Sequence, residues 1–115
     1  HQGPQGITRV NTVPLKPGMI LSIEPGVYLE GKLGIRLENL VYIKRMRGHF
    51  RQKKEFYEFE TLTLAPFEKN LIEKKLLSRD ELRWLNSYHE NVYQKLSPFL
   101  GQTEKTWLRD TCKIL

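Results

Sequence analysis

Apolar and polar positions follow two different periods in the two parts of the chain. Before Pro66 the apolar residues form short, β-rich runs separated by turn residues. After Pro66 they recur every three or four positions, the period of a helix with one buried side. The pattern therefore predicts an α+β chain in which antiparallel strands (residues 1–65) precede helices (residues 66–115).

Three runs predict the strands: residues 19–24, 35–43 and 56–64. Pro25-Gly26 should interrupt pairing directly after Glu24, because proline cannot donate to a β-ladder. The glycine-punctuated residues 30–34 predict a hairpin reversal. The middle run alternates and is expected to point four apolar side chains to one face: Ile35, Leu37, Val41 and Ile43.

The helices carry clear start and stop signals. Ser78 and Glu81 have the spacing of a capping box, and Ser97-Pro98 should end the helix that follows. The stripe along this helix is expected to pack on the sheet: Leu82, Leu85, Tyr88 or His89, Val92 and Leu96. A shorter helix is predicted from Thr103 to the C-terminus, with one face formed by Trp107, Leu108, Thr111 and Leu115.

Composition narrows the classes of protein to which the chain could belong. The 115 residues suffice for one small domain, and no apolar run approaches the roughly 20 residues of a membrane span, so no membrane partner is expected. The one cysteine, Cys112, excludes an internal disulfide and is expected to be buried. Much of the net charge of +6 lies in residues 45–54, read as a solvated loop. No nucleic-acid partner is expected, because interleaved aromatic residues are missing there.

Two glutamates lie inside apolar strands, where carboxylates are rare unless paired or bound to metal. If the hairpin is symmetric about Gly31, residues whose numbers add to 62 face each other. Glu24 then faces Glu38, with Cβ atoms roughly 5 Å apart. Like charges at this distance repel, whereas two carboxylates could bridge divalent ions roughly 3.5–4 Å apart.

The spacing alone leaves alternatives to a metal site. Arg36 shares a face with Glu38, so the glutamates could belong to a buried Arg–Glu network. A bulge at Pro25-Gly26 could also slip the register and expose one of the two. Two carboxylates do not complete a dinuclear centre, which needs further protein ligands.

The segments around these glutamates resemble those of a known family. Residues 22–28 (SIEPGVY) and 34–39 (GIRLEN) resemble the S-x-E-P-G-x-Y and G-I-R-x-E-N motifs of pita-bread metallopeptidases, which include methionine aminopeptidase, prolidase and aminopeptidase P. Residues 1–7 (HQGPQGI) are similar to the H-E-G-P-x-G-I segment of aminopeptidase P.

The resemblance extends over nearly the whole chain. Residues 59–66 (FETLTLAP) and 84–89 (WLNSYH) resemble the C-terminal extension of three-domain Xaa-Pro aminopeptidases. It implies that residues 1–65 are the C-terminal strands of the pita-bread catalytic domain and that residues 66–115 are this helical extension.

The resemblance also implies an activity and its residues. Such enzymes release the N-terminal residue from Xaa-Pro peptides with two divalent ions, typically manganese. Glu24 matches a metal ligand that is also the candidate general base, and Glu38 matches the ligand that bridges both ions. His1 matches a substrate-binding, catalytic histidine. Arg36 and Tyr28 match positions that orient the glutamates and relay protons.

Departures from the family pattern limit this expectation. Gln2 replaces the usual glutamate, and Val27 stands where an aromatic residue is common. The family's two aspartate ligands and its histidine ligand lie upstream of the segment that His1 begins, so the chain alone is expected to be an inactive fragment. The alternatives are a non-catalytic interaction module of the same fold, using residues 45–54 to bind an acidic partner, and a prolidase-like dipeptidase.

The family resemblance further implies a homodimer, with Tyr88, Tyr93 and Trp107 as exposed anchors. Cysteine usage favours a reducing, cytoplasmic location. His49 is expected in the basic loop and His89 at the edge of a helix–sheet interface, both without a catalytic role.

Overall fold

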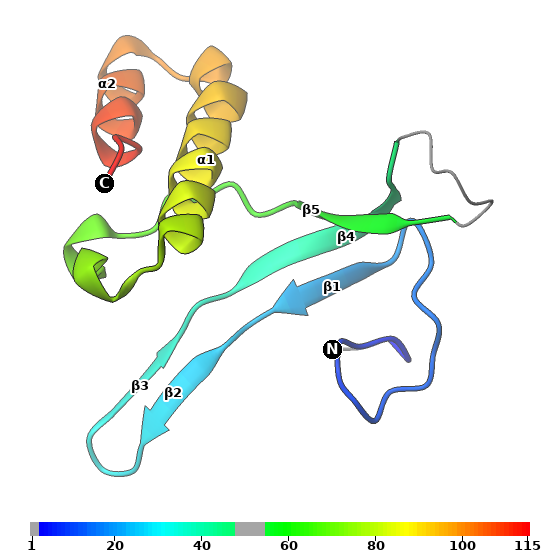
Figure 1. The fold of residues 1–115 in the computed structure, drawn as a ribbon. Helices are drawn as coiled ribbons and strands as arrows, with labels where there is room; N and C mark the ends of the chain where they lie inside the picture. Colours follow the sequence, from blue (N-terminus) through cyan, green and yellow to red (C-terminus); the bar gives the residue numbers. More distant parts are fainter. Residues whose placement is uncertain (1–2, 48–54) are drawn as a thin grey trace. The chain divides into compact units, whose positions relative to one another are not determined.

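The structure, a computed structural model, describes residues 3–47 and 55–115. The chain divides into two compact units, here called the sheet unit (His1–Thr63) and the helical unit (Leu64–Leu115). Strands precede helices along the chain, as predicted (Figure 1). None of the helices in the described ranges is long and apolar enough to cross a membrane.

The sheet unit is built from antiparallel strands. The strands are β1 (Ile20–Ile23), β2 (Gly26–Leu29), β3 (Leu33–Arg36), β4 (Asn39–Arg45) and β5 (Tyr57–Thr61). One sheet has the order β1-β4-β5, and β2 pairs with β3 in a second. The two pairings β1–β4 and β2–β3 follow each other along one ribbon that ends in the β2–β3 turn (Figure 1).

The register of this ribbon is the predicted one. Ile23 faces Asn39 in the first ladder and Gly26 faces Arg36 in the second, so facing residue numbers add to 62 in both. Gly31 has a φ of 68° at the turn, a backbone conformation that glycine adopts without steric cost. The slipped register considered above is therefore wrong.

The predicted continuous strand over residues 35–43 is wrong, because the ribbon is interrupted on both sides. β1 ends at Ile23, one residue before the predicted break after Glu24, and the partner strand stops at the matching point between β3 and β4. Pro25 has no N–H, so its pair with Leu37 keeps only the bond from Leu37 N to Pro25 O, of 3.0 Å. The apolar alternation is consequently split, since Val41 is buried whereas Ile35 is 60% exposed.

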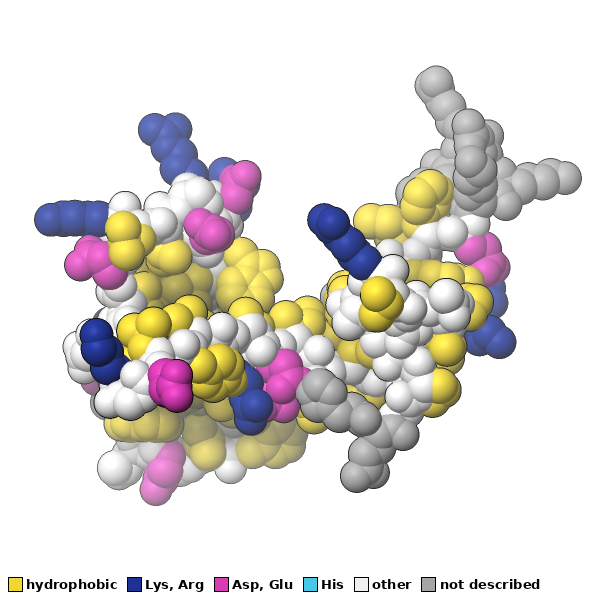
Figure 2. Space-filling view, turned by 90° about the horizontal axis from the view of Figure 1, so that it is seen from below, with side chains coloured by type: hydrophobic (Ala, Val, Ile, Leu, Met, Phe, Trp, Pro, Cys, Tyr) yellow, Lys and Arg dark blue, Asp and Glu magenta, His cyan; other side chains and the backbone are white. Residues whose placement is uncertain are grey.

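The buried core of the sheet unit lies on one face of β1 and β4. It consists of Leu21, Val41 and Ile43, against which Leu15 and Met19 pack. Glu24 and Glu38 lie just beyond these strands, Glu24 after β1 and Glu38 before β4. Large apolar side chains also reach the surface of the β2–β3 ribbon, as they do elsewhere on the molecule (Figure 2).

The helical unit begins with two short 3-10 turns and continues with two helices. Its elements are η1 (Lys69–Leu71), η2 (Lys74–Leu76), α1 (Arg79–Leu96), η3 (Ser97–Phe99) and α2 (Gln102–Thr111). The predicted capping box is confirmed: Glu81 N donates to Ser78 Oγ and Ser78 N donates to Glu81 Oε2. α1 ends before Ser97-Pro98, as predicted.

The core of the helical unit is formed between α1 and α2. Within the helical unit the α1 stripe packs on α2: Tyr88 and Val92 form one cluster with Leu108 and Cys112. The predicted α2 face is right for Leu108, which is buried, but wrong for Trp107, which is 62% exposed; Cys112, one turn after Leu108, is buried in its place. Burial raises the pKa of the Cys112 thiol, as is usual for a packing cysteine.

Two consecutive residues of α1 hold the first residues of the helical unit. The Tyr88 hydroxyl donates to Ala65 O at 2.7 Å, and Phe67 N donates to His89 Nε2 at 3.0 Å. Tyr88 is 5% exposed and His89 is fully buried. The expectations of an exposed Tyr88 and an edge position for His89 are therefore wrong, because both rings pack against Phe67.

His89 gives a prediction for the pH dependence of stability. Burial, with the charge of Lys69 as a lesser cause, lowers the pKa of His89 below its ordinary value. As the pH falls through the ordinary histidine value of about 6.5, the unfolded chain takes up a proton before the folded one does. The free energy of unfolding should therefore fall between about pH 7 and pH 5, and fall less in His89→Gln, which keeps an acceptor but does not titrate. Denaturant unfolding at each pH tests this, and parallel profiles would contradict it.

Candidate metal-binding site

Glu24 and Glu38 lie opposite each other in the interruption of the ribbon. Glu24 follows β1 and Glu38 precedes β4. The adjacent pair, Pro25 and Leu37, is joined by a backbone hydrogen bond. In an antiparallel ladder such pairs alternate with non-hydrogen-bonded ones, in which the side chains approach more closely. The shared register therefore puts the two glutamates at a close, non-hydrogen-bonded position.

One arginine joins the two carboxylates. Arg36 Nη1 lies 3.5 Å from Glu24 Oε2, and Arg36 Nη2 lies 3.6 Å from Glu38 Oε2. The side chains of Glu24, Glu38 and Arg36 are 20%, 44% and 52% exposed, so the network is open to solvent and not buried. The guanidinium supplies positive charge where two like charges would otherwise repel.

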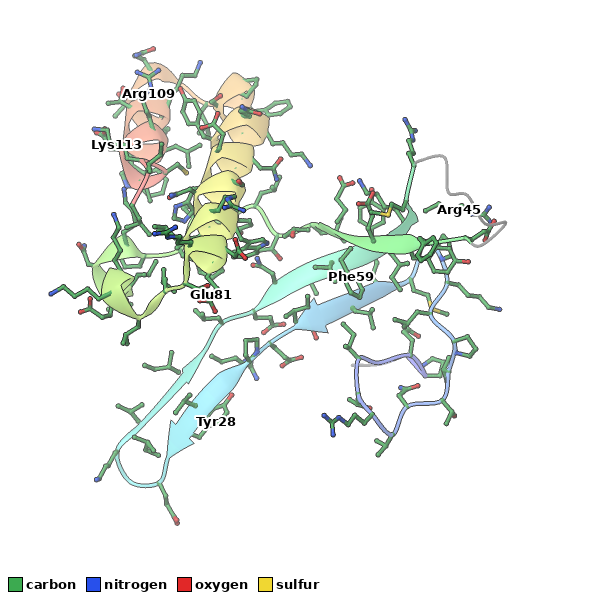
Figure 3. The ribbon with its side chains drawn as sticks, in the orientation of Figure 1. Tyr28, Arg45, Phe59, Glu81, Arg109 and Lys113 are labelled. Atoms are coloured by element: carbon green, nitrogen blue, oxygen red, sulfur yellow. The ribbon has the colours of Figure 1, made fainter. Side chains whose placement is uncertain are left out.

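Tyr28 lies flat beside this network because two glycines leave room for its ring. A Cβ added to Gly26 would come within 2.7 Å of the Tyr28 hydroxyl, and one added to Gly34 within 2.9 Å of Tyr28 Cδ1. The ring thus spans the facing pair Tyr28–Gly34 and reaches Gly26, with its hydroxyl at the end nearer Glu24. Figure 3 shows Tyr28 on the β2–β3 ribbon. Any side chain at either glycine would displace the ring.

A second polar cluster continues along the same face of β4. Lys44 Nζ lies 2.8 Å from Glu60 Oε2 and 3.4 Å from Glu58 Oε1 on β5. Hydrogen bonding to Glu60 raises the pKa values of both Tyr42 and Lys44. Lys44, Glu58 and Glu60 thus form an ion-pair network across β4 and β5, with Tyr42 hydrogen-bonded to Glu60.

The donor set fits part of a metal site. Carboxylate oxygens are the ligands that hard divalent cations such as Mn²⁺ and Mg²⁺ prefer. Within residues 3–47 and 55–115, however, no group of three or more His, Cys, Asp or Glu side chains could hold a metal ion. Glu24 and Glu38 can therefore contribute two ligands, and a complete centre would need others from outside these ranges.

Of the three histidines, the structure describes His89 alone. His1 and His49 lie outside the described residues, as does most of the basic run, of which Arg45 pairs with Glu55 at 2.6 Å. His89 belongs to the core of the helical unit, where its Nε2 accepts from Phe67 N.

Two features of the site escaped the sequence prediction. Ser22 donates its hydroxyl to Glu24 Oε1 at 2.6 Å. The signal for it was present, because residues two apart on a strand share a face. The contact of Lys44 with Glu60 had no such signal, since the register of β4 against β5 depends on the long connection between them.

The chain matches the models of two protein families. Residues 1–45 match the model of metallopeptidase family M24, and residues 55–115 match the model described as the C-terminal region of peptidase_M24. The chain therefore belongs to the M24 metallopeptidases, the pita-bread family that its motifs resemble.

Two curated relatives carry the same name. The chain is 41% identical to a "Probable Xaa-Pro aminopeptidase P" of Laccaria bicolor over 122 residues, covering all of this chain and 19% of that protein. It is 44% identical to a protein of the same name from Aspergillus fumigatus over 121 residues, covering 99% of this chain and 18% of that protein. The chain thus spans about a fifth of the length of these relatives.

A solved structure supports the fold. The X-prolyl aminopeptidase of Caenorhabditis elegans, described as a cytosolic enzyme with a di-nuclear active site, matches with a TM-score of 0.76 and 33% identity. The match covers 88% of this chain and 17% of that one. The antiparallel strands followed by helices are therefore the C-terminal part of the pita-bread aminopeptidase fold.

Proposed function

We propose that the chain is the C-terminal part of a dinuclear metallopeptidase that releases the N-terminal residue from Xaa-Pro peptides. The observation that carries this proposal is the convergence of Glu24 and Glu38 on one arginine, at facing positions of an interrupted hairpin. M24 membership and relatives named Xaa-Pro aminopeptidase P support it. Because the three other family ligands lie upstream, residues 1–115 alone should be inactive.

The residues have distinct roles in this proposal. Glu24 and Glu38 would hold the metal ions, and Glu24 would also accept a proton from the attacking water as general base. Two divalent ions, manganese in our proposal, would polarise the peptide carbonyl and make water a better nucleophile. Arg36 and Tyr28 orient the two glutamates. His1 binds the peptide near the scissile bond.

The proposed domain bounds, cellular location and oligomeric state follow from the same proposal of an Xaa-Pro aminopeptidase. Residues 1–65 would be the last strands of the catalytic domain, and residues 66–115 its helical extension. We also propose a cytoplasmic homodimer. The cytosolic C. elegans relative supports the location. Apolar side chains of the helical unit support the dimer, including Phe99, which is 85% exposed, and Trp107, which is 62% exposed. Tyr93 is a poorer anchor, because Arg109 donates to its hydroxyl.

The test uses the full-length protein and three substrates. These are a tripeptide with proline in second position, its alanine counterpart, and an Xaa-Pro dipeptide. We expect hydrolysis of the proline tripeptide, much slower hydrolysis of the alanine one, loss of activity on chelation, and recovery with Mn²⁺. Preference for the dipeptide would favour a prolidase-like enzyme. No hydrolysis with any of Mn²⁺, Co²⁺ or Zn²⁺ would favour the non-catalytic module.

A further inference from the structure

Ser22 donates a hydroxyl hydrogen bond to Glu24, and the facing strand places no hydroxyl opposite Ser22. Ser22 lies in β1 with regular ladder pairs on both sides of it, and its hydroxyl is 2.6 Å from Glu24 Oε1. The residue facing Ser22 is Leu40, which stands in the corresponding place beside Glu38 and has no hydroxyl to offer. Glu24 is therefore held by a hydroxyl two residues before it, whereas the residue two before Glu38 is Arg36, which pairs with both glutamates.

This contact supplies an anchor where the backbone lacks one. Glu24 lies past the end of β1 and directly before Pro25, so the regular ladder does not extend through it. Ser22 belongs to the sheet with the buried core, and its side chain reaches forward from that rigid part. With Ser22 at Oε1 and Arg36 Nη1 at Oε2, both carboxylate oxygens have a partner, which fixes the rotation of the carboxylate plane.

We propose that Ser22 is a positioning residue for Glu24 that presets its carboxylate for metal binding. The inference rests on the proposed function, because it assumes that Glu24 is a ligand. Partners that orient a ligating carboxylate typically change metal affinity or activity by about 10- to 100-fold when they are removed. Ser22 should therefore act mainly on metal affinity, and the loss should follow the hydroxyl, not the volume, of the side chain.

A matched pair of variants separates the effect of the hydroxyl at position 22 from the effect of side-chain shape. Ser22→Thr and Ser22→Val have side chains of nearly equal shape, and both suit a strand, but only threonine can donate to Glu24. Metal-free full-length protein is titrated with Mn²⁺ alone by calorimetry, and its melting temperature is recorded. We expect Kd for Mn²⁺ to rise about 10- to 100-fold in Ser22→Val and to stay within about 3-fold of wild type in Ser22→Thr. At saturating Mn²⁺, kcat in Ser22→Val should largely recover.

The possible outcomes distinguish the role of Ser22 from the assignment of the metal site. Equal Mn²⁺ affinities in the threonine and valine variants would overturn the role of Ser22, even if both are weaker than wild type. If wild type binds Mn²⁺ and Glu38→Ala does not, the metal assignment stands whatever Ser22 does. If wild type binds no Mn²⁺, both proposals fall. Should the valine variant melt much lower than wild type, Ser22→Ala replaces it, with the same expected loss of affinity and the same rescue by threonine.

Discussion

Replacing Glu38 by alanine in the full-length protein should lower kcat/KM for an Xaa-Pro tripeptide by at least about a thousandfold. Metal ions contribute several kcal/mol of charge stabilisation, and each 1.4 kcal/mol is about a factor of ten in rate. Without Glu38, Arg36 would lose one of its two carboxylate partners, and the proposed ligand that bridges the ions would be gone. Steady-state kinetics and metal analysis of the same preparation measure both effects.

Glu30→Ala is the matched control for this change. Glu30 lies in the turn between β2 and β3 on the same ribbon, is exposed, and precedes Gly31 at the hairpin apex. Its removal changes the net charge as Glu38→Ala does, yet should leave kcat/KM and metal content within about twofold of wild type, as is usual for an exposed residue outside a site. If Glu38→Ala retained its metal and its rate alongside this control, the metal assignment would be wrong.

Leu108→Ala should destabilise the helical unit by about 2–5 kcal/mol. Leu108 is 2% exposed and packs against Tyr88, Val92 and Cys112, so its truncation loses apolar burial and leaves a cavity between α1 and α2. Native-state hydrogen exchange reports the free energy of opening amide by amide. Protection should fall across the buried turns of α1 and α2 in the full-length protein.

The neighbouring residue provides the control for Leu108. Trp107 precedes it in α2, is larger, and is 62% exposed. If burial and not side-chain size sets the cost, Trp107→Ala should change the opening free energy of the same amides by less than about 1 kcal/mol. Comparable losses in the two variants would show that the exposed face of α2 is packed in the full-length protein, and would give the dimer proposal a measurable starting point.

Local features of the sequence predicted the parts of the fold that depend on near neighbours. The capping box of α1 was predictable because Ser78 and Glu81 satisfy backbone donors within one turn. The facing of Glu24 and Glu38 was predictable because a hairpin with a short turn allows few registers, and Gly31 marked its centre. The break at Pro25 followed from the missing N–H of proline, although its effect on the partner strand was not anticipated.

Contacts between distant residues depended on tertiary packing. An apolar stripe on α1 shows that a face is buried, but not what buries it, and within the helical unit the partner is α2. Tyr88 and His89 read as interface residues because nothing near them in the sequence shows that Ala65 O and Phe67 N return to meet them. The Lys44–Glu60 pair likewise required the β4–β5 register.

The amino-acid sequence by itself determined the order of strands and helices, the hairpin that brings two glutamates together, and the motifs of the M24 family. The tertiary structure decided which partners hold those glutamates. Arg36 lies between the two carboxylates, Ser22 holds one of them, and the ring of Tyr28 lies over two glycines. The physical reason is that a short hairpin follows from local geometry, whereas the direction of each side chain depends on the space that its neighbours leave.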